Sequence, residues 1–559
     1  MGLRADAQPR CLYLHPSAIS RRLLEDEEDI MTSQTAVLTI DVGSGSVRAI
    51  VWNRWGQILG MSQHEWTYAL SDVPGGLDFD TAAGWAATVT CIREAIERAC
   101  GEDGSIDREN IKAVSAASMR EGFVLYDDVG KEIWAIPNVD ARAQEEAAEL
   151  LEEGHGPEFF RIAGDWTSLA ASARLRWVQK KRPDLWAKAA HMTMLGDWVL
   201  YRLSGVFTAD PSLGSSSAMF DLRERTWSKH IAQVIGAKHI LPQVRESGTV
   251  IGEITAAAAS ETGLLPGTVI VAGGADNMLG MVGARAVETN QIGIAGGTYW
   301  LTAGITDRPV LDDAMELRSL CHAIPGKWIL EGCGFAHGFS TRIVRDGLLR
   351  EANPAFDESN GYEYLTKIAR DCPPGANGVF YFASNVMNTK SWKHPVPSIV
   401  GLDPFRVEET GLPSIYRAVM EEAAYGARAH RDMIEHVWGH GASETIFFGG
   451  PSRSELWCQI VADVLGVDLK VPRGPEATAL GSALCAFVGA GEFASLDDAV
   501  AEASYRHRTF HPIPENVTAY ERLYPQWRAL NDHMLEASDK GLAPYMWVGA
   551  GAASPLSQR

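Results

Sequence analysis

Asp41 stands at the end of an apolar run and directly before a turn of alternating glycine and serine. The stretch reads LTIDVGSGSVRAIVW. Backbone amides of such a turn, with the hydroxyls of Ser44 and Ser46, can bind an anion. A carboxylate beside a phosphate is repulsive unless a cation lies between them, so we expect Asp41 to hold Mg²⁺ largely through water. We expect Gly43, Ser44 and Ser46 to bind the phosphate.

The same stretch has a plainer interpretation as a tight hairpin whose glycines only supply positive φ. From this segment alone the two interpretations are about equally good. A dinucleotide site is a weaker alternative, because the third glycine of that fingerprint is missing and a strand rather than a helix follows. The sequence has no GxxxxGK[ST] segment, which excludes a P-loop.

A second group of polar residues follows a predicted strand at 111–116. Arg120 and Glu121 lie in VSAASMREGFVLYD, and Asn138 and Asp140 lie in IWAIPNVDAR. An Arg-Glu pair is usually a surface ion pair, and the Asn-Asp segment alone is equally well a polar turn. A guanidinium beside a carboxylate can also donate to and accept from neighbouring hydroxyls, as a sugar requires.

Asp276, in AGGADNMLG, follows a strand and begins a helix. The commonest role of Asp at such a position is that of an N-cap, whose removal costs about 1 kcal/mol.

Strand–turn–strand units occur twice along the chain. The first unit covers 36–41, 47–53 and 57–66, and a helix over 81–99 follows it. The second unit is NQIGIAGGTYWLTAGITD, with a Gly-Gly-Thr turn. This repetition predicts two structurally related halves.

The predicted organisation is an α/β fold with two large domains, as a chain of 559 residues leads one to expect. The predicted segments are a disordered extension over 1–32, an N-terminal domain over 33–284, a C-terminal domain over 285–540 and a tail over 541–559.

Composition narrows the function classes. A formal net charge of -21 argues against a nucleic-acid surface, which would need clustered Lys and Arg. The 8 cysteines form no CxxC pair, which is typical of reduced thiols in a cytoplasmic protein. No apolar run is long enough to span a bilayer. We therefore expect neither a nucleic-acid nor a membrane partner.

Several ordered segments together resemble the FGGY carbohydrate kinases, members of the actin-like ATPase superfamily, over about residues 35–535. DVGSGSVRA is similar to the first phosphate hairpin of that family, AGGTYW to the second, and FFGGPSRSELWCQIVADVLG with EATALGSAL to the adenosine segment. SLAASARLRWVQ approximates a family signature but has Arg174 where Lys is usual. Ser44 stands where Thr is usual and keeps the hydroxyl.

The resemblance implies two ribonuclease H-like ATPase domains with the active site in the cleft between them, and ATP and Mg²⁺ as cofactors. It implies that Asp276 is the catalytic base and also touches the acceptor. The acceptor-binding residues that it implies are Arg120, Glu121, Asn138, Asp140 and Asp276. The ATP-binding residues that it implies are Gly43, Ser44, Ser46, Gly297, Thr298, Gly449, Gly450, Ser452 and Ser454.

Within the family, the MREG context, Tyr299-Trp300 and the segments DVPGGLDFD and SNVMNTKSWKHPVPSIVGLD are most similar to the autoinducer-2 kinases. That likeness implies transfer of the ATP γ-phosphoryl group to the terminal hydroxyl of 4,5-dihydroxy-2,3-pentanedione. A pentulose kinase of the xylulokinase or ribulokinase type is the alternative. A nucleotide-binding sugar sensor or chaperone-like ATPase is the alternative of another class. The resemblance also implies a phosphotransferase-system carrier protein and a second copy of the chain as partners.

Overall fold

The computed structural model describes most of the chain from residue 35 to residue 548. The described ranges are 35–102, 104–167, 170–297, 299–334, 337–350, 361–383, 386–388, 393–474, 476–503 and 507–548. The predicted extension over 1–32, Thr298 and the last part of the predicted tail lie outside these residues.

A six-stranded sheet forms the centre of the first half, in the order β14-β15-β6-β1-β2-β3. Its strands are β1 (Ala36–Val42), β2 (Ser46–Asn53), β3 (Ile58–Glu65), β6 (Ile111–Ser118), β14 (Val250–Glu253) and β15 (Val269–Ala275). Strand β1 pairs antiparallel with β2 and parallel with β6, and β6 pairs parallel with β15. The predicted strands at 36–41, 47–53, 57–66 and 111–116 are confirmed.

A seven-stranded sheet forms the centre of the second half, in the order β18-β19-β17-β16-β23-β24-β25. Its strands are β16 (Gln291–Gly296), β17 (Trp300–Thr306), β18 (Arg318–Cys321), β19 (Trp328–Gly334), β23 (Glu444–Gly449), β24 (Leu469–Pro472) and β25 (His507–Phe510). Here β16 pairs antiparallel with β17 and parallel with β23, just as β1 does with β2 and β6. The two sheets therefore repeat one topology, with the two glycine hairpins in equivalent places.

Helices cover both faces of the first sheet. On one face, α2 (Thr81–Cys100), α7 (Leu195–Ser204) and α10 (Ala256–Thr262) bury Leu38 and Ile40 of β1. On the other face, α11 (Asp276–Gly283), α18 (Ala477–Gly489) and α19 (Leu496–Glu502) share a core with Val37. The alternation of side chains along β1 thus supplies both cores.

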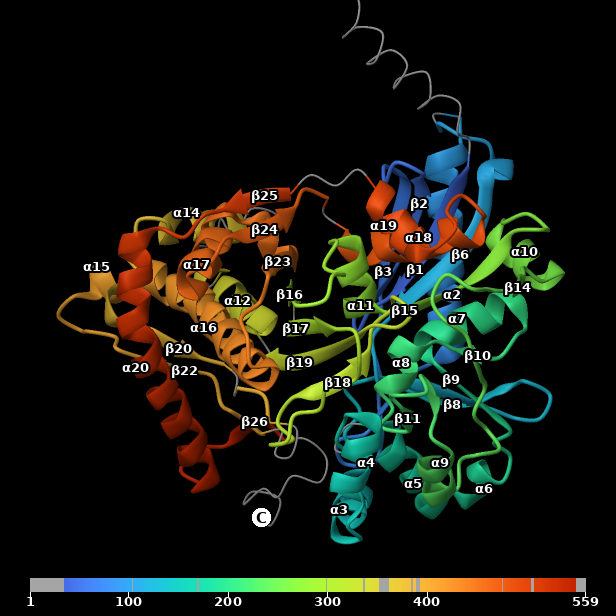
Figure 1. Ribbon diagram of the computed structural model, residues 1–559, viewed down its shortest axis with the longest axis horizontal. Coiled ribbons are helices and arrows are strands. Elements are labelled where there is room, and N and C mark those ends of the chain that lie inside the picture. Colours follow the sequence, from blue (N-terminus) through green and yellow to red (C-terminus); the bar gives the residue numbers. More distant parts are fainter. Residues whose placement is uncertain are drawn as a thin grey trace, which may run out of the picture.

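Helix α18 is remote in sequence from the sheet that it covers (Figure 1). It crosses α11 closely, because a Cβ on Gly481 would lie 1.9 Å from the carbonyl oxygen of Leu279 and one on Gly283 would lie 1.8 Å from that of Ala477. The small residues of EATALGSAL thus serve close packing. The segment predicted as the C-terminal domain therefore returns two of its helices, α18 and α19, to the first sheet.

The second sheet packs against a long helix, α16 (Leu412–Trp438), and shares one core with α17 (Glu455–Leu465) and α20 (Pro514–Asp539). Figure 1 shows these three helices on the side of the second sheet that faces away from the first half. Other elements of this half are α12 (His337–Arg342), the π-helix η2 (Ile343–Leu349), α14 (Gly361–Ala369), β20 (Phe380–Phe382), β21 (Lys393–Pro395), β22 (Ser398–Val400), α15 (Val407–Thr410) and β26 (Tyr545–Val548). Strand β26, within the predicted tail, pairs with β21.

The first half carries a further group of elements between β6 and β14. A three-stranded sheet comprises β7 (Phe123–Tyr126), β8 (Glu132–Ile136) and β9 (His191–Met194). The helices around it are α3 (Gln144–Glu152), α4 (His155–Ala163), α5 (Ala171–Lys181), α6 (Pro183–Trp186), α8 (Pro211–Ser215) and α9 (Lys229–Ile235). Short two-stranded pairs join β10 (Thr208–Ala209) to β13 (Gln243–Val244) and β11 (Phe220–Asp221) to β12 (Thr226–Trp227). Another such pair, before β6 in the sequence, joins β4 (Ala69–Leu70) to β5 (Leu77–Asp78).

Candidate active site

Three parallel strands of the first sheet bring the polar residues predicted from the sequence to one edge. Val42, Ser118 and Ala275 are neighbours across β1, β6 and β15. Because parallel strands end at the same edge, the residues next to these three converge. Those residues are Asp41, Arg120, Glu121 and Asp276.

The turn between β1 and β2 is held by its own backbone. The amide of Gly43 donates to the carbonyl of Ser46 at 2.9 Å, and the amide of Trp66 donates to that of Gly45 at 3.1 Å. A Cβ on Gly45 would meet no atom within 4 Å in the part of the chain that the structure describes, and its φ lies outside the left-handed region. The protein itself therefore does not need glycine at position 45, and the open space suits a group that approaches the turn.

Asp41 is half-buried beside this turn. Burial raises the pKa of its carboxyl group to about 6, Arg48 opposes the rise, and Glu476 adds to it. Glu476 precedes α18 and forms ion pairs with Arg48 of β2 and, at 3.1 Å, with Arg453. The first hairpin is thus tied by charge to two segments of the second half of the sequence.

Asp276 is the first residue of α11 and does not act as its N-cap, which is Ala275. Its carboxylate accepts from the amide of Asn277 at 2.7 Å. Burial raises the pKa of Asp276 to about 7; the positive charge of Arg120 lowers it, and the negative charges of Asp41 and Glu121 raise it. A carboxyl group with a pKa near neutrality is suited to accept a proton at physiological pH.

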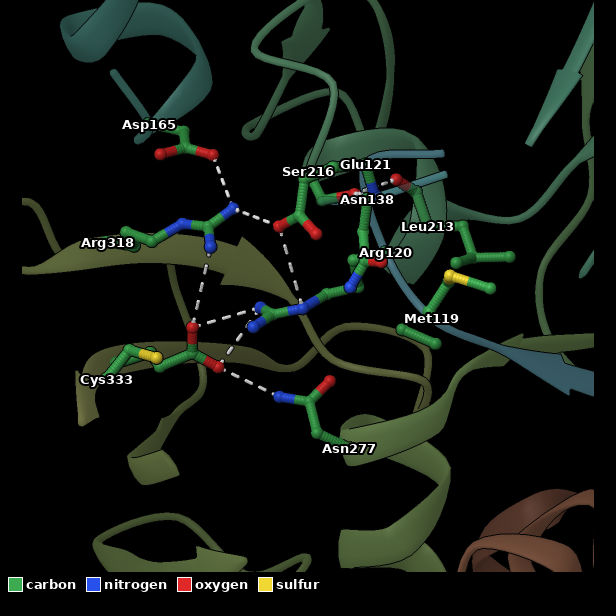
Figure 2. Close-up of polar contacts among 12 residues, drawn as sticks. Met119, Arg120, Glu121, Asn138, Asp165, Leu213, Ser216, Asn277, Arg318 and Cys333 are labelled. Carbon is green, nitrogen blue, oxygen red and sulfur yellow. Dashed lines mark hydrogen bonds and ion pairs between the residues drawn. The ribbon is translucent and has the colours of Figure 1, made fainter. Parts of the chain in front are cut away.

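Arg120 and Glu121 find their partners in the second sheet rather than in each other. The Nη1 of Arg120 donates to both carboxylate oxygens of Glu331, at 3.0 and 3.1 Å, whereas its Nε lies 3.9 Å from Glu121. The Nη2 of Arg318 donates to Glu121 at 2.9 Å and to Asp165 at 2.6 Å. Figure 2 shows these contacts at the junction of the two halves.

Glu121 has a left-handed backbone, with φ of 63°. This conformation is uncommon for a non-glycine residue and holds the segment in a sharp turn directly after β6. The amide of Glu121 donates to the hydroxyl of Ser216 at 3.4 Å, and the amide of Met119 donates to the carbonyl of Val42 at 2.9 Å. The turn thereby fastens the Arg-Glu pair to the first hairpin.

Asn138 and Asp140 lie in different environments. Asn138 is half-buried, and its Nδ2 donates to the hydroxyl of Ser44 at 3.1 Å. Asp140 is buried and accepts from the Nε of Arg142 at 2.6 Å and from the amide of Leu77 at 2.9 Å. Asn138 therefore contacts the β1–β2 hairpin, while Asp140 supports the loop behind it. The contact of either residue with an acceptor stays a prediction.

Arg174 connects the loops of this wall. Its guanidinium is buried and donates to the backbone carbonyls of Glu121, Asn138 and Asp140, at 2.7, 2.7 and 2.6 Å. Three donors in a fixed fork suit three carbonyls better than the single ammonium of Lys would. Sequence reasoning noted the unusual Arg at this position but missed this role.

The corresponding edge of the second sheet carries glycines. Gly296 and Gly449 pair across β16 and β23. Gly449 is required by the fold, because its φ is 96° and a Cβ there would lie 2.2 Å from the carbonyl oxygen of Gly296. Gly450 is not so constrained, since a Cβ there would meet no atom of the described residues within 4 Å. Gly297 is exposed, and its neighbour Thr298 lies outside the described residues.

The serines after Gly450 make contacts within the chain. The hydroxyl of Ser452 donates to the carbonyl of Gly449 at 2.7 Å. Ser454 is the N-cap of α17 and accepts from the amide of Trp457 at 3.3 Å. Their contact with a nucleotide stays a prediction.

Four residues of the site escaped the sequence reasoning: Glu331, Arg318, Asp165 and Asn277. The Nδ2 of Asn277 donates to Glu331 at 2.8 Å. Asp165 and Arg318 are remote from each other in sequence, and only the junction of the two halves makes them partners. Of these four residues, Asn277 could have been suspected from the sequence, because it directly follows Asp276 at the start of α11.

Metal ligands are sparse here. Among the described residues no three His, Cys, Asp or Glu side chains are grouped so that they could hold a metal ion. A magnesium ion that is held mainly by phosphate oxygens and water needs only one or two carboxylates. Asp41 fits this need, because its charge and that of Asp276 repel each other and an added cation would relieve the repulsion. Within the described residues no helix is long and apolar enough to cross a membrane.

Comparison with known proteins finds two family models along the chain. Residues 36–283 match the N-terminal domain of the FGGY family of carbohydrate kinases, and residues 319–490 match its C-terminal domain. The autoinducer-2 kinase of Yersinia enterocolitica is 37% identical over 93% of this chain and 98% of that relative. The autoinducer-2 kinase of Salmonella paratyphi A is 36% identical over 92% and 97%.

Solved structures share the fold. The xylulose kinase of Rhodospirillum rubrum aligns with a TM-score of 0.76 at 23% identity, over 89% of this chain and 99% of that one. The glycerol kinase of Plasmodium falciparum, solved with ADP, aligns with a TM-score of 0.76 at 16% identity, over 90% and 98%.

Proposed function

The chain belongs to the FGGY family of carbohydrate kinases, and we propose that it transfers the γ-phosphoryl group of ATP to the terminal hydroxyl of 4,5-dihydroxy-2,3-pentanedione. The observation that carries the reaction is the convergence of Asp41, Arg120, Glu121 and Asp276 at one edge of the first sheet. The substrate rests on the likeness to autoinducer-2 kinases over nearly the whole length of both chains.

Asp276 is the general base of this proposal. Its ionised carboxylate accepts a hydrogen bond from the acceptor hydroxyl and takes the proton late in the reaction. The hydroxyl oxygen forms a bond to the γ-phosphorus as the bond from that phosphorus to the bridging oxygen breaks, and ADP leaves. Arg120 and Glu121 orient the acceptor, because together they offer hydrogen-bond donors and acceptors to adjacent hydroxyl groups.

In this proposal the nucleotide phosphates are bound more by backbone amides than by side chains. The open turn at Gly43, Ser44 and Ser46 and the glycines at 297 and 450 leave room for phosphate oxygens near peptide amides. Asp41 would hold Mg²⁺, which neutralises charge on the phosphates during transfer. Asn138 fixes the Ser44 hydroxyl from the acceptor side and thereby connects the two substrates.

Coupled ADP release with a panel of acceptors tests this function. We expect turnover with 4,5-dihydroxy-2,3-pentanedione to exceed that with xylulose, ribulose and glycerol. A wide margin in favour of a pentulose would contradict the proposed substrate but not the kinase activity. ATP hydrolysis that no polyol changes would favour the sensor or chaperone alternative. A carrier protein as regulator, a homodimer and a cytoplasmic location remain predictions from the resemblance.

A further inference from the structure

A cluster of five charged residues builds the wall behind the proposed acceptor site. Arg120, Glu121 and Asp165 belong to the first half of the chain, and Arg318 and Glu331 belong to β18 and β19 of the second sheet. Each of the five side chains is at most 11% exposed. Figure 2 shows how the two guanidiniums lie between carboxylates at this junction.

Both guanidiniums are already neutralised within the cluster. Both carboxylate oxygens of Glu331 accept hydrogen bonds from Arg120, and Arg318 donates to both Glu121 and Asp165. Three carboxylates face two guanidiniums, so the cluster carries an excess negative charge. Asp276, whose carboxylate interacts with Arg120 and Glu121, adds a further negative charge when it ionises.

The charge balance of the cluster decides whether a neutral or an anionic acceptor can bind beside it. A neutral polyol needs only hydrogen bonds, which paired Arg and Glu side chains still supply through their remaining donors and lone pairs. An anionic acceptor needs an unpaired cation, because burying its carboxylate next to like charges is costly. Resting on the proposed kinase function, we propose that Glu331 is a specificity-determining residue, which keeps Arg120 neutralised and so excludes sugar acids in favour of neutral acceptors.

Removing the charge of Glu331 should therefore change which ligands bind. Glu331→Gln keeps the shape of the side chain and its ability to accept from Asn277, but it removes the excess negative charge of the cluster. Arg120 is left with the longer, 3.9 Å contact to Glu121, a carboxylate that Arg318 already holds. The freed guanidinium can then pair with a ligand carboxylate in a bidentate manner. At the separation of such a pair, even a well-screened charge is worth about tenfold in affinity.

The test compares D-gluconate with D-glucitol, which has a similar chain of hydroxyls and no charge. Their inhibition constants against the preferred neutral acceptor are measured for the wild type and for Glu331→Gln. We expect glucitol to inhibit the wild type better than gluconate does, and the ratio to shift toward gluconate by at least about tenfold in the variant. An unchanged ratio, or no gluconate binding to a folded Glu331→Gln, would overturn the proposal.

A matched control separates specificity from stability. Glu421 of α16 is equally buried and pairs with Arg417 at 2.8 Å, but it lies in the core of the second half. Glu421→Gln should lower the melting temperature and leave the gluconate-to-glucitol ratio as in the wild type. If Glu331→Gln does not fold, Asp165→Asn replaces it, because it partly frees Arg318 and predicts the same direction of change.

The outcome is separable from that of the proposed function. A wild-type protein that phosphorylates no neutral acceptor contradicts the kinase proposal itself. A wild-type kinase that binds gluconate as well as glucitol leaves the kinase proposal intact and contradicts the role of Glu331.

Discussion

The two glycine hairpins occupy the same place in two sheets of the same topology, yet they differ in charge. The β1–β2 hairpin carries Asp41 just before its turn and lies beside the charged side chains at the ends of β6 and β15. The β16–β17 hairpin and the neighbouring end of β23 carry Gly296, Gly297, Gly449 and Gly450. A single architecture thus carries charged side chains at one edge and glycines at the other.

The difference fits what each of the two substrates requires in the proposed reaction. Activating a hydroxyl requires a carboxylate with a tuned pKa, which needs burial and charged neighbours. Binding phosphates requires amides and space, which side chains would obstruct. The second half contributes charge to the first edge through Arg318 and Glu331, on β18 and β19, and through Glu476, which pairs with Arg48 beside the first hairpin.

The largest expected effect tests whether the chemistry resides at the first edge. Asp276→Asn should lower kcat by about 10²-fold or more while ATP still binds, because the amide cannot accept the proton. ADP release at saturating substrates measures it. Asp463→Asn is the control. This buried aspartate of the second half lies outside the proposed active site, so its replacement should lower stability only. Near wild-type turnover of a folded Asp276→Asn would show that the chemistry does not depend on this carboxylate at the first edge.

The pH dependence sharpens the same point. Because the base works only when ionised and its pKa is raised to about 7, kcat/KM should fall tenfold for each pH unit below about 7 and level off above it. Asp41 raises this pKa, so Asp41→Asn should move the acid limb to lower pH whatever it does to the maximal rate. An acid limb that stays in place would show that the two carboxylates are not coupled.

A smaller effect probes the second edge. Gly450→Ala adds a methyl group where the protein leaves open space, so folding should be preserved and the KM for ATP should rise about five-fold. Initial rates at varied ATP measure it. Gly347→Ala, at an exposed position of η2 where a Cβ would lie 4.0 Å from the Ile343 side chain, should leave the KM unchanged. Equal KM values for both variants would mean that the open space at Gly450 is not used by the nucleotide.

The smallest effect concerns a hydroxyl near that edge. Ser454→Ala should lower the free energy of unfolding by about 1 kcal/mol, because α17 loses its N-cap, and the KM for ATP tests separately whether Ser454 also contacts the nucleotide. Urea unfolding and initial rates measure the two quantities. A clear rise in KM with unchanged stability would make Ser454 a nucleotide ligand, as the resemblance implied.

Much of the frame could be predicted from local patterns. The apolar, β-branched runs around Asp41 and the glycine turn predicted β1 and β2 within about a residue, and the repeated strand–turn–strand unit predicted two related halves. The positions of Asp41, Arg120 and Asp276 at or just past the ends of strands could also be predicted from the sequence, but their convergence depended on the parallel pairing of β1, β6 and β15 that the structure shows.

Other features depended on distant contacts. Nothing around residue 480 indicates that α18 packs on the first sheet, and the role of Arg174 required three carbonyls from separate loops. The plainer interpretation of Asp276 was that it is the N-cap of a helix, but Ala275 is the N-cap in the structure.

By itself the sequence determined the strands, the two glycine turns and the side chains that end the strands, because these depend on neighbours along the chain and on the period of two in a strand. Only the tertiary structure decided the partners of those side chains. Arg120 meets Glu331, and Glu121 meets Arg318, across more than 190 residues of chain. Charge balance at a buried site is a property of everything packed around it, so no local pattern could have predicted it.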